Sequence, residues 1–213
     1  MALTGAQAPG ATPLRDEDIK GLKHAVTTFG ELNELEAANI VQGQEWALKS
    51  RLTKMPDMLS DDYLRRLHKR MYGDVWKWAG KYRDYDTNIG VTFPRIWPEL
   101  RIIYDDARHW IDNSTFPPDE LVIRLHHRLV WVHPFSNGNG RLCRMMADLV
   151  MMKHFKIDRL PWGGDDLVDA GPRRAAYIEA LHDADVHDYT RLLKFCRSTE
   201  SAEDAEPTPT SAP

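Results

Sequence analysis

Apolar residues recur every three or four positions over most of this chain, and that spacing is what most constrains its fold. Such a run places its apolar side chains on one face of a helix, so it predicts helices packed around a core. The predicted helices cover residues 28–51, 60–73, 97–112, 118–132, 140–155, 172–184 and 187–197. Only residues 82–95 have the composition of extended chain, with a turn at Asn88–Gly90. The sequence therefore predicts an all-α bundle with one small β-hairpin.

The two ends of the chain differ from its middle. Residues 1–15 are small or polar and are interrupted by proline and glycine, and residues 198–213 contain no large apolar side chain. Such segments bury too little apolar surface to offset the entropy lost on ordering. We therefore predict a flexible N-terminal segment over 1–15, one domain with a helical N-terminal extension over 16–197, and a disordered tail over 198–213.

Composition narrows the class of protein further. The chain has 213 residues, which suit one domain, and no apolar stretch approaches the roughly 20 residues of a membrane-spanning helix. The first residues lack the basic start and apolar core of a signal peptide, and two cysteines are too few for a disulfide scaffold. We therefore expect a cytoplasmic protein without membrane association. The formal net charge of −4 gives no reason to expect direct nucleic-acid binding.

One run of residues carries the functional argument. His133-Pro-Phe-Ser-Asn-Gly-Asn-Gly-Arg-Leu-Cys-Arg144 joins two of the predicted helices. Its glycines and asparagines permit a concave nest of backbone N–H groups, which opens on the N-terminus of the next helix and favours an anion. Arg141 and Arg144 share one face of that helix, and two guanidinium groups above a nest suit a polyphosphate. His133, on the other side of the loop, is a candidate general base for a hydroxyl nucleophile.

This run resembles the signature of the Fic/Doc family, His-Pro-Phe-x-[Asp/Glu]-Gly-Asn-Gly-Arg-x-x-Arg, and the likeness extends over roughly residues 25–195. Trp78–Arg83 followed by Asn88–Val91 resembles the approach to the family's flap hairpin, and Tyr177–Leu181 resembles its C-terminal helix. With Glu31–Glu36 included, the pattern is most similar to the branch called mobile mystery protein B. The matching signature positions are His133, Pro134, Phe135, Gly138, Asn139, Gly140, Arg141 and Arg144.

The resemblance implies a protein adenylyltransferase that transfers AMP from ATP to a Ser, Thr or Tyr hydroxyl of a target protein. His133 would take the proton from that hydroxyl, and Phe135 would pack into the core and fix the loop. The phosphates would contact Gly138, Asn139 and Gly140 as an anion hole, with Asn139 on the α-phosphate, Arg141 on the β-phosphate side and Arg144 on the γ-phosphate. The flap would hold the target segment as an added strand, through Asn88, Ile89, Gly90, Val91 and Thr92.

The chain departs from the signature at Asn137, where the family has the acidic residue that binds Mg²⁺ on the phosphates. An amide oxygen can bind Mg²⁺ but lacks the charge that attracts this cation. Three alternatives follow. Asn137 forms a weaker metal site, another carboxylate replaces the missing one, or the protein uses a different nucleotide or has weak transfer activity.

A second expectation from the resemblance concerns inhibition. Many family members carry a [Ser/Thr]-x-x-x-Glu-[Gly/Asn] segment whose glutamate pairs with the second arginine of the signature, and Thr27–Asn33 resembles a degenerate copy. On that hypothesis Glu31 pairs with Arg144 and blocks the γ-phosphate. The alternative is that Thr28 and Glu31 form only a helix capping box.

Two other functions stay open at this stage. One is an enzyme with the same site and another transfer, such as a phosphoryl group, another nucleoside monophosphate or the removal of AMP. The other is a nucleotide-binding or protein-binding module with weakened catalysis. The expected partners are a nucleotide and a target protein, with an antitoxin or regulatory partner as a further alternative.

Overall fold

The computed structural model describes residues 3–5, 12–51, 55–164, 167 and 171–199. These residues divide into two compact units, one made of the described residues up to Arg159 and one of those from Leu160 onward. Both units are built from helices.

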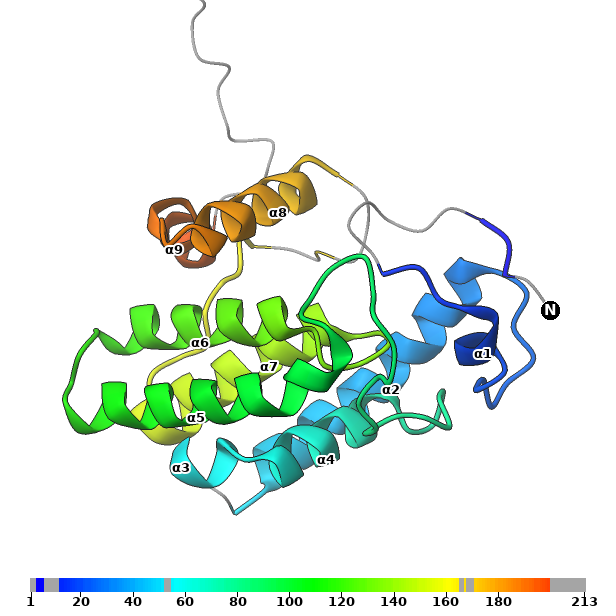
Figure 1. The fold of residues 1–213 in the computed structure, drawn as a ribbon, viewed down its shortest axis with the longest axis horizontal. Helices are drawn as coiled ribbons and strands as arrows, with labels where there is room; N and C mark the ends of the chain where they lie inside the picture. The colour runs from blue at the N-terminus through cyan, green and yellow to red at the C-terminus, as the bar shows by residue number, and fades with distance from the viewer. Residues whose placement is uncertain (1–2, 6–11, 52–54, 165–166, 168–170, 200–213) are drawn as a thin grey trace, which may run out of the picture. The chain divides into compact units, whose positions relative to one another are not determined.

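In the first unit, the long helix α2 packs along α4, and both contact α7 (Figure 1). Helix α7 also packs against α6, and α6 packs against α5. The elements of this unit are α1 (Asp16–Ile19), α2 (Phe29–Lys49), α3 (Met55–Met58), α4 (Asp61–Tyr72), the 3₁₀ turn η1 (Phe93–Arg95), α5 (Ile96–Asp112), α6 (Pro118–Val132), α7 (Asn139–Val150) and the π-helical segment η2 (Met151–Phe155). The second unit consists of α8 (Pro172–Asp185) packed against α9 (Thr190–Arg197).

Each helix that the apolar spacing predicts is present within a few residues of its predicted limits. Two of these helices begin at side-chain caps. Thr28 Oγ1 accepts the backbone N–H of Glu31 at 3.1 Å, and Ser60 Oγ accepts that of Tyr63 at 3.2 Å. The apolar spacing and the capping residues therefore indicate the same helix limits that the structure shows.

Glycine allows α2 to approach α4 closely. A Cβ at Gly43 would lie 2.7 Å from Met71 Cγ and 2.8 Å from Met71 Cα, so any larger residue would push the two helices apart. The buried face of α2 also carries Glu36 and Asn39. Asn39 is satisfied by the backbone N–H of Asp74 at 2.9 Å, whereas Glu36 extends toward the loop between α6 and α7.

The predicted β-hairpin over residues 82–95 is wrong. In the described structure, residues 81–92 form an irregular loop, which η1 follows, and no strand pairs across the loop. The reason is the side chain of Arg83, whose guanidinium donates to the carbonyl oxygens of Tyr85 at 2.7 Å and Val91 at 2.5 Å. These side-chain bonds take the place of the cross-strand backbone bonds that a hairpin would need.

Most of the two predicted flexible ends lies outside the described residues. Thr12 and Arg15 are described, and both make specific contacts, while the flexibility of the segment over 1–15 stays a prediction. The predicted domain limits at 16 and 197 stay predictions. A membrane-spanning segment is not found among the described helices, because none combines sufficient length with sufficient apolar character.

Candidate active site

The loop between α6 and α7 reverses the chain with two left-handed residues. His133, just after α6, has φ 53° and ψ 61°, and Gly138, just before α7, has φ 81°. A side chain at Gly138 would be strained at this φ, and its Cβ would lie 2.4 Å from the ring of Tyr72. Glycine is therefore required here by the backbone and by its neighbour. We call residues His133–Gly138 the motif loop.

Phe135 anchors the motif loop in the core, as predicted. Its side chain is fully buried and stacks on the ring of His68, with ring centroids 3.8 Å apart and an interplanar angle of 16°. Tyr82 packs against it from another side, at 5.1 Å between centroids. The loop backbone is thus tied to α4 through one aromatic side chain.

His68 supports the motif loop, and sequence reasoning missed it. Its Nδ1 accepts the backbone N–H of Gly80 at 3.0 Å, so the proton of the neutral ring lies on Nε2, which donates to the carbonyl of Asn137 at 3.1 Å. Burial lowers the pKa of His68 to about 3 and keeps the ring neutral. A single histidine on the buried face of a helix forms no motif, so only the fold reveals its role.

Asn139 closes the motif loop with both atoms of its amide. Its Oδ1 accepts the backbone N–H of Phe135 at 2.9 Å, and its Nδ2 donates to the carbonyl of Phe135 at 2.7 Å. The side chain is almost fully buried. The second N–H of Nδ2 takes no part in these two bonds, so the predicted contact of Asn139 with an α-phosphate stays a prediction. In the structure, Asn139 holds the motif loop closed.

Gly140, in the first turn of α7, leaves space beside a guanidinium group. A Cβ built there would approach only one side-chain atom, Arg144 Nη1, at 3.8 Å. The helix has no side-chain cap, so its N-terminal N–H groups and dipole face the same region. This end of α7 has the geometry that an anion requires, with Arg141 and Arg144 on one helix face.

A carboxylate of α2 forms hydrogen bonds with two side chains of the motif. Glu36 is 1% exposed, and its Oε2 accepts a hydrogen bond from Arg141 Nη2 at 2.5 Å. Its Oε1 accepts from Asn137 Nδ2 at 2.8 Å and from Trp76 Nε1 at 2.7 Å. Charge-assisted bonds of this kind are the stronger ones in proteins. The first arginine of the motif is therefore paired with Glu36 in this structure.

The Glu31 carboxylate, predicted to pair with Arg144, has other partners in this structure. The Glu31 carboxylate is exposed and bonds to the backbone N–H of Thr27 at 2.8 Å and of Thr28 at 3.3 Å, and it does not contact Arg144. These bonds lower the pKa of Glu31, as expected for a carboxylate that accepts backbone N–H groups at a helix start. The capping box accounts for Glu31, and the glutamate that reaches the motif lies further along the same helix.

The groups around Asn137 do not fit a metal ion held by the protein. Asn137 Oδ1 accepts the backbone N–H of Gly138 at 2.8 Å, so the amide oxygen is turned into the loop. The nearest carboxylate, Glu36, is already bonded to three donors. In the described part of the chain, no group of three or more His, Cys, Asp or Glu side chains converges on one point. The predicted metal ligand at Asn137 is therefore not supported by the donor geometry.

His133 is buried and bonded to a hydroxyl group. Its Nε2 lies 2.7 Å from Thr12 Oγ1, and the residue is 6% exposed. Burial, followed by the positive charge of Arg83, lowers the pKa of His133 to about 4. The ring is consequently neutral at pH 7, with a nitrogen available to accept the proton of a hydroxyl.

Arg83 fixes the backbone around His133. Its Nε donates to the carbonyl of His133 at 2.7 Å, and its Nη2 donates to that of Val132 at 3.3 Å, which neutralises the C-terminal end of α6. The loop that Arg83 organises also touches His133, since a Cβ at Gly90 would lie 2.5 Å from His133 Cβ. Residues 88–92 thus border His133 without forming a hairpin, and their role in holding a target stays a prediction.

The buried histidines make stability depend on pH. Burial lowers the pKa of His68 and of His126 to about 3, below the ordinary histidine value near 6.5. Between these values the unfolded chain binds more protons than the folded one, so the free energy of unfolding falls as the pH is lowered from 7. The expected loss by pH 5 is on the order of 2 kcal/mol for each such histidine. Urea denaturation at pH 7, 6 and 5 measures it, and a constant value would contradict the burial of neutral rings.

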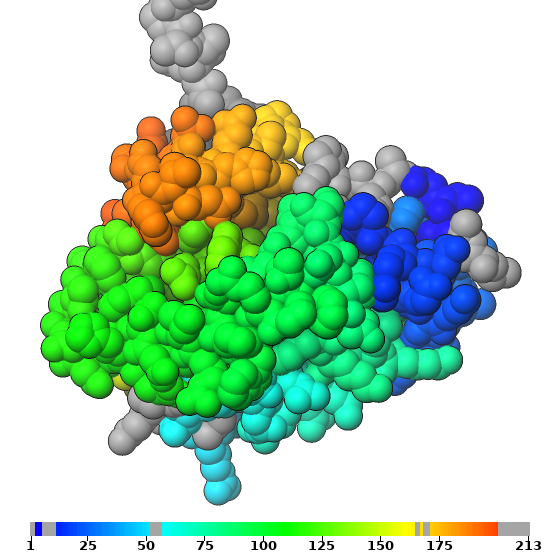
Figure 2. Space-filling model, in the orientation of Figure 1, coloured from blue at the N-terminus to red at the C-terminus, as the bar shows by residue number. Residues whose placement is uncertain are grey.

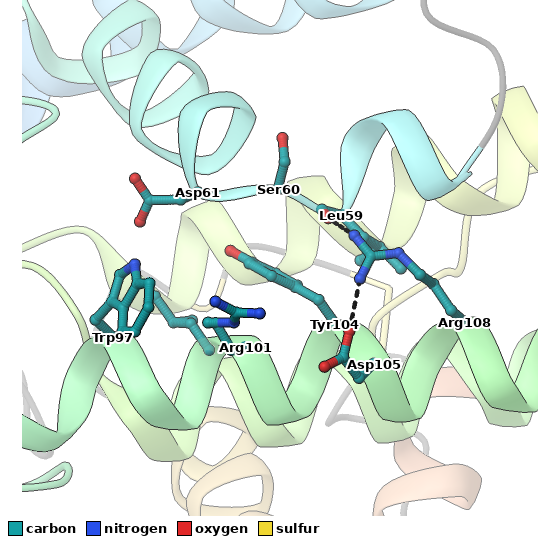
Figure 3. A pocket seen from close by; sticks show the side chains of 9 residues that line it. Leu59, Ser60, Asp61, Trp97, Arg101, Tyr104, Asp105 and Arg108 are labelled. Atoms are coloured by element: carbon teal, nitrogen blue, oxygen red, sulfur yellow. Dashed lines mark hydrogen bonds and ion pairs between the residues drawn. The ribbon is translucent and has the colours of Figure 1, made fainter.

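A separate pocket of about 260 Å³ lies between the start of α4 and one face of α5 (Figure 3). Tyr104 extends from α5 toward Ser60 and Asp61, and Arg108 donates to Asp105 at 2.9 Å and to the Leu59 carbonyl at 2.7 Å. No residue of the motif loop or of α7 lines this pocket. It therefore does not belong to the candidate active site.

Comparison with known proteins agrees with this geometry. Residues 58–151 match the sequence model of the Fic/DOC family. Over these residues the chain is similar to the Fic/DOC family. The match covers α4 to α7 and the first residue of η2, and therefore includes the whole motif loop.

Several proteins to which this chain is similar are protein adenylyltransferases by name. The chain is 30% identical to protein adenylyltransferase fic-1 of Caenorhabditis elegans over 166 residues, which cover 74% of the chain and 31% of that protein. It is 27% identical to protein adenylyltransferase Fic of Nematostella vectensis over 175 residues, which cover 78% of the chain and 39% of that protein. The chain thus spans about a third of the length of the first of these curated relatives.

Solved structures share the fold. Fic-1 of C. elegans (residues 134–508 of that protein) has a TM-score of 0.56 at 28% identity, covering 76% of this chain and 48% of that one. The N-terminal FIC domain of Bep8 from Bartonella sp. 1-1C has a TM-score of 0.64 at 15% identity, covering 88% and 93%. The second likeness shows the fold alone.

Proposed function

We propose that this chain transfers AMP from ATP to a Ser, Thr or Tyr hydroxyl of a protein. The observation that carries the proposal is the pairing of a buried, neutral His133, bonded to a hydroxyl, with an uncapped helix N-terminus flanked by two arginines. The names of the relatives support the same activity.

The first step of the proposed reaction is the removal of a proton from the acceptor hydroxyl. His133 Nε2 accepts the proton, and the left-handed backbone that Arg83 fixes holds the ring in place. The acceptor oxygen then attacks the α-phosphorus of ATP, and the bond from this phosphorus to the oxygen that bridges to the β-phosphate breaks. Pyrophosphate leaves, and the positive groups offset its charge.

The nucleotide would bind at the N-terminus of α7. The backbone N–H groups of Asn139 and Gly140 and the helix dipole would face the α- and β-phosphates, and Arg144 would extend toward the γ-phosphate. The N–H of Gly138 is bonded to Asn137 Oδ1 instead. A neighbouring structure, the N-terminal Fic domain of a Bartonella quintana effector protein, contains bound ADP and supports a nucleotide site in this fold. The residues around Asn137 do not build a magnesium site, so no step here is assigned to Mg²⁺.

Arg141 must exchange partners during this reaction. In the structure it is paired with Glu36, whereas the β-phosphate would require the same guanidinium. We therefore propose that Glu36, in place of the predicted Glu31, competes with the nucleotide for the motif.

Replacing Glu36 by Gln is expected to strengthen ADP binding roughly tenfold, because it removes one charge-assisted bond to Arg141. The amide of Gln keeps an oxygen for Trp76 Nε1, so the fold should be preserved. Isothermal titration calorimetry of the wild type and the variant with ADP measures the affinity.

Two matched variants lie on the same helix as Glu36. Glu31→Gln removes the capping carboxylate, and Glu34→Gln changes an exposed residue. Neither should change the affinity for ADP. An unchanged affinity in Glu36→Gln, or an increase in Glu31→Gln, would contradict the competition by Glu36.

The second candidate function is transfer from another nucleotide at this site, because Asn137 departs from the family signature. ATP, GTP and UTP are compared as donors, and His133-dependent release of pyrophosphate distinguishes the two candidates. Release from ATP alone supports the proposal, and release only from another nucleotide supports the alternative. The narrower likeness to mobile mystery protein B, a cytoplasmic location and an antitoxin partner stay predictions.

A further inference from the structure

A hydroxyl group of this chain occupies the place of an acceptor at His133. Thr12 Oγ1 lies 2.7 Å from His133 Nε2, and the two residues are 7% and 6% exposed. Among the described residues, His133 is the hydrogen-bond partner found for this hydroxyl. With the ring proton on Nδ1, the Thr12 O–H donates to Nε2, which is the contact that a general base makes with the proton it removes.

The segment that presents Thr12 is held in place by its own contacts. The Arg15 guanidinium lies 3.0 Å from the centroid of the Tyr85 ring, and the Tyr85 hydroxyl donates to Asp18 at 2.7 Å. Trp78 Nε1 donates to the carbonyl of Asp18 at 3.1 Å. In Figure 2 the dark-blue surface of this segment adjoins the green surface of the loop before α5. The contacts of Arg15 and Asp18 therefore hold the segment that contains Thr12.

Other threonine hydroxyls in this part of the chain have ordinary acceptors. Thr4 Oγ1 donates to the carbonyl of Thr27 at 3.1 Å, Thr27 Oγ1 donates to Glu31, and Thr87 Oγ1 donates to the carbonyl of Ile89. These partners are backbone carbonyls and the exposed carboxylate of Glu31, and none of them belongs to the motif loop. Thr12 differs because its partner is the nitrogen of the candidate base.

We propose that Thr12 is a self-modification site, which accepts a nucleoside monophosphate from a nucleoside triphosphate bound at the N-terminus of α7. This inference rests on the proposed function and names one acceptor for it. His133 Nε2 takes the proton of the Thr12 hydroxyl, and Oγ1 forms a bond to the α-phosphorus. The bond between this phosphorus and the leaving oxygen breaks, and pyrophosphate departs. The product is a phosphodiester on Thr12.

The burial of the Thr12 hydroxyl and of the His133 ring favours Thr12 over water as the acceptor. Because the hydroxyl fills the position at Nε2, a water molecule cannot be activated there while Thr12 is in place. The neutral state of the ring at pH 7 keeps Nε2 able to accept the proton. After transfer, Oγ1 carries no proton, so it cannot be activated by His133 a second time. Each chain is consequently modified once at this site.

The test is an incubation of the full chain with ATP and divalent cation, followed by peptide mapping with tandem mass spectrometry. Thr12→Val removes the hydroxyl and keeps the shape, and Thr12→Ser keeps a hydroxyl. Thr4→Val is the matched control, since that hydroxyl is bonded to a backbone carbonyl. His133→Gln removes the base. Pyrophosphate release is measured in parallel, so that nucleotide turnover is followed separately from the adduct.

The expected result is an AMP adduct on Thr12 in the wild type, Thr12→Ser and Thr4→Val, and no adduct on residue 12 in Thr12→Val or His133→Gln. Its rate should not depend on protein concentration, because acceptor and base belong to one chain. His133-dependent pyrophosphate release without a Thr12 adduct would overturn this inference and leave the proposed function standing. Absence of both the adduct and any pyrophosphate release would contradict both.

Discussion

Replacing His133 by Gln is expected to reduce AMP transfer by about 100-fold or more, the usual contribution of a positioned general base. Gln can still accept a hydrogen bond from Thr12, but its amide does not take up a proton at neutral pH. The backbone that Arg83 fixes is not changed by this substitution. The transfer rate, measured as label incorporated from ATP labelled on its α-phosphate, tests the expectation.

The same variant should bind nucleotide as the wild type does, because His133 lies across the loop from the N-terminus of α7. Calorimetric titration with ADP is the matching control. Equal transfer by His133→Gln and the wild type would show that another group removes the proton. Loss of both transfer and ADP binding would instead show that His133 is needed for the shape of the motif loop.

Replacing Phe135 by Ala is expected to lower the free energy of unfolding by about 3–5 kcal/mol, the usual cost of removing a fully buried aromatic side chain. The ring stacks on His68 and contacts Tyr82, so its removal leaves a cavity beneath the motif loop. The loss would also free the loop that carries His133. Urea denaturation of both proteins measures the difference.

A milder substitution separates stability from activity. Phe135→Leu keeps most of the apolar volume but loses the stack on His68, so it should cost less stability than Phe135→Ala. It should still reduce ADP binding, because the motif loop is no longer held to α4 through the aromatic pair. Unfolding free energies within experimental error of the wild type for Phe135→Ala would contradict the anchoring role.

The helices could be predicted from the sequence because each signal is local. Apolar spacing and caps such as Thr28 and Ser60 act within one or two turns of chain, so they determine helix limits independently of the rest of the fold. The order of residues in the motif, a base followed by glycines and then two arginines, likewise indicated an anion site near His133.

The parts that the sequence did not predict depend on contacts between distant segments. Arg83 replaces the expected hairpin by bonding to carbonyls from two parts of the chain. Glu36 reaches Arg141 from α2, a helix that packs on α4 and also contacts α7. Thr12 lies in a segment whose composition predicts flexibility, yet Arg15 and its neighbours attach it beside His133. No local pattern encodes these three contacts.

The central claim is AMP transfer through His133, and one measurement tests it most directly. The purified chain is incubated in parallel with ATP labelled on the α-phosphate and with ATP labelled on the γ-phosphate, and protein-bound label is counted. Label is expected on the wild-type protein from the α-phosphate and not from the γ-phosphate, and the α-label should be lost in His133→Gln. Label from the γ-phosphate, or α-label that persists in His133→Gln, would contradict it.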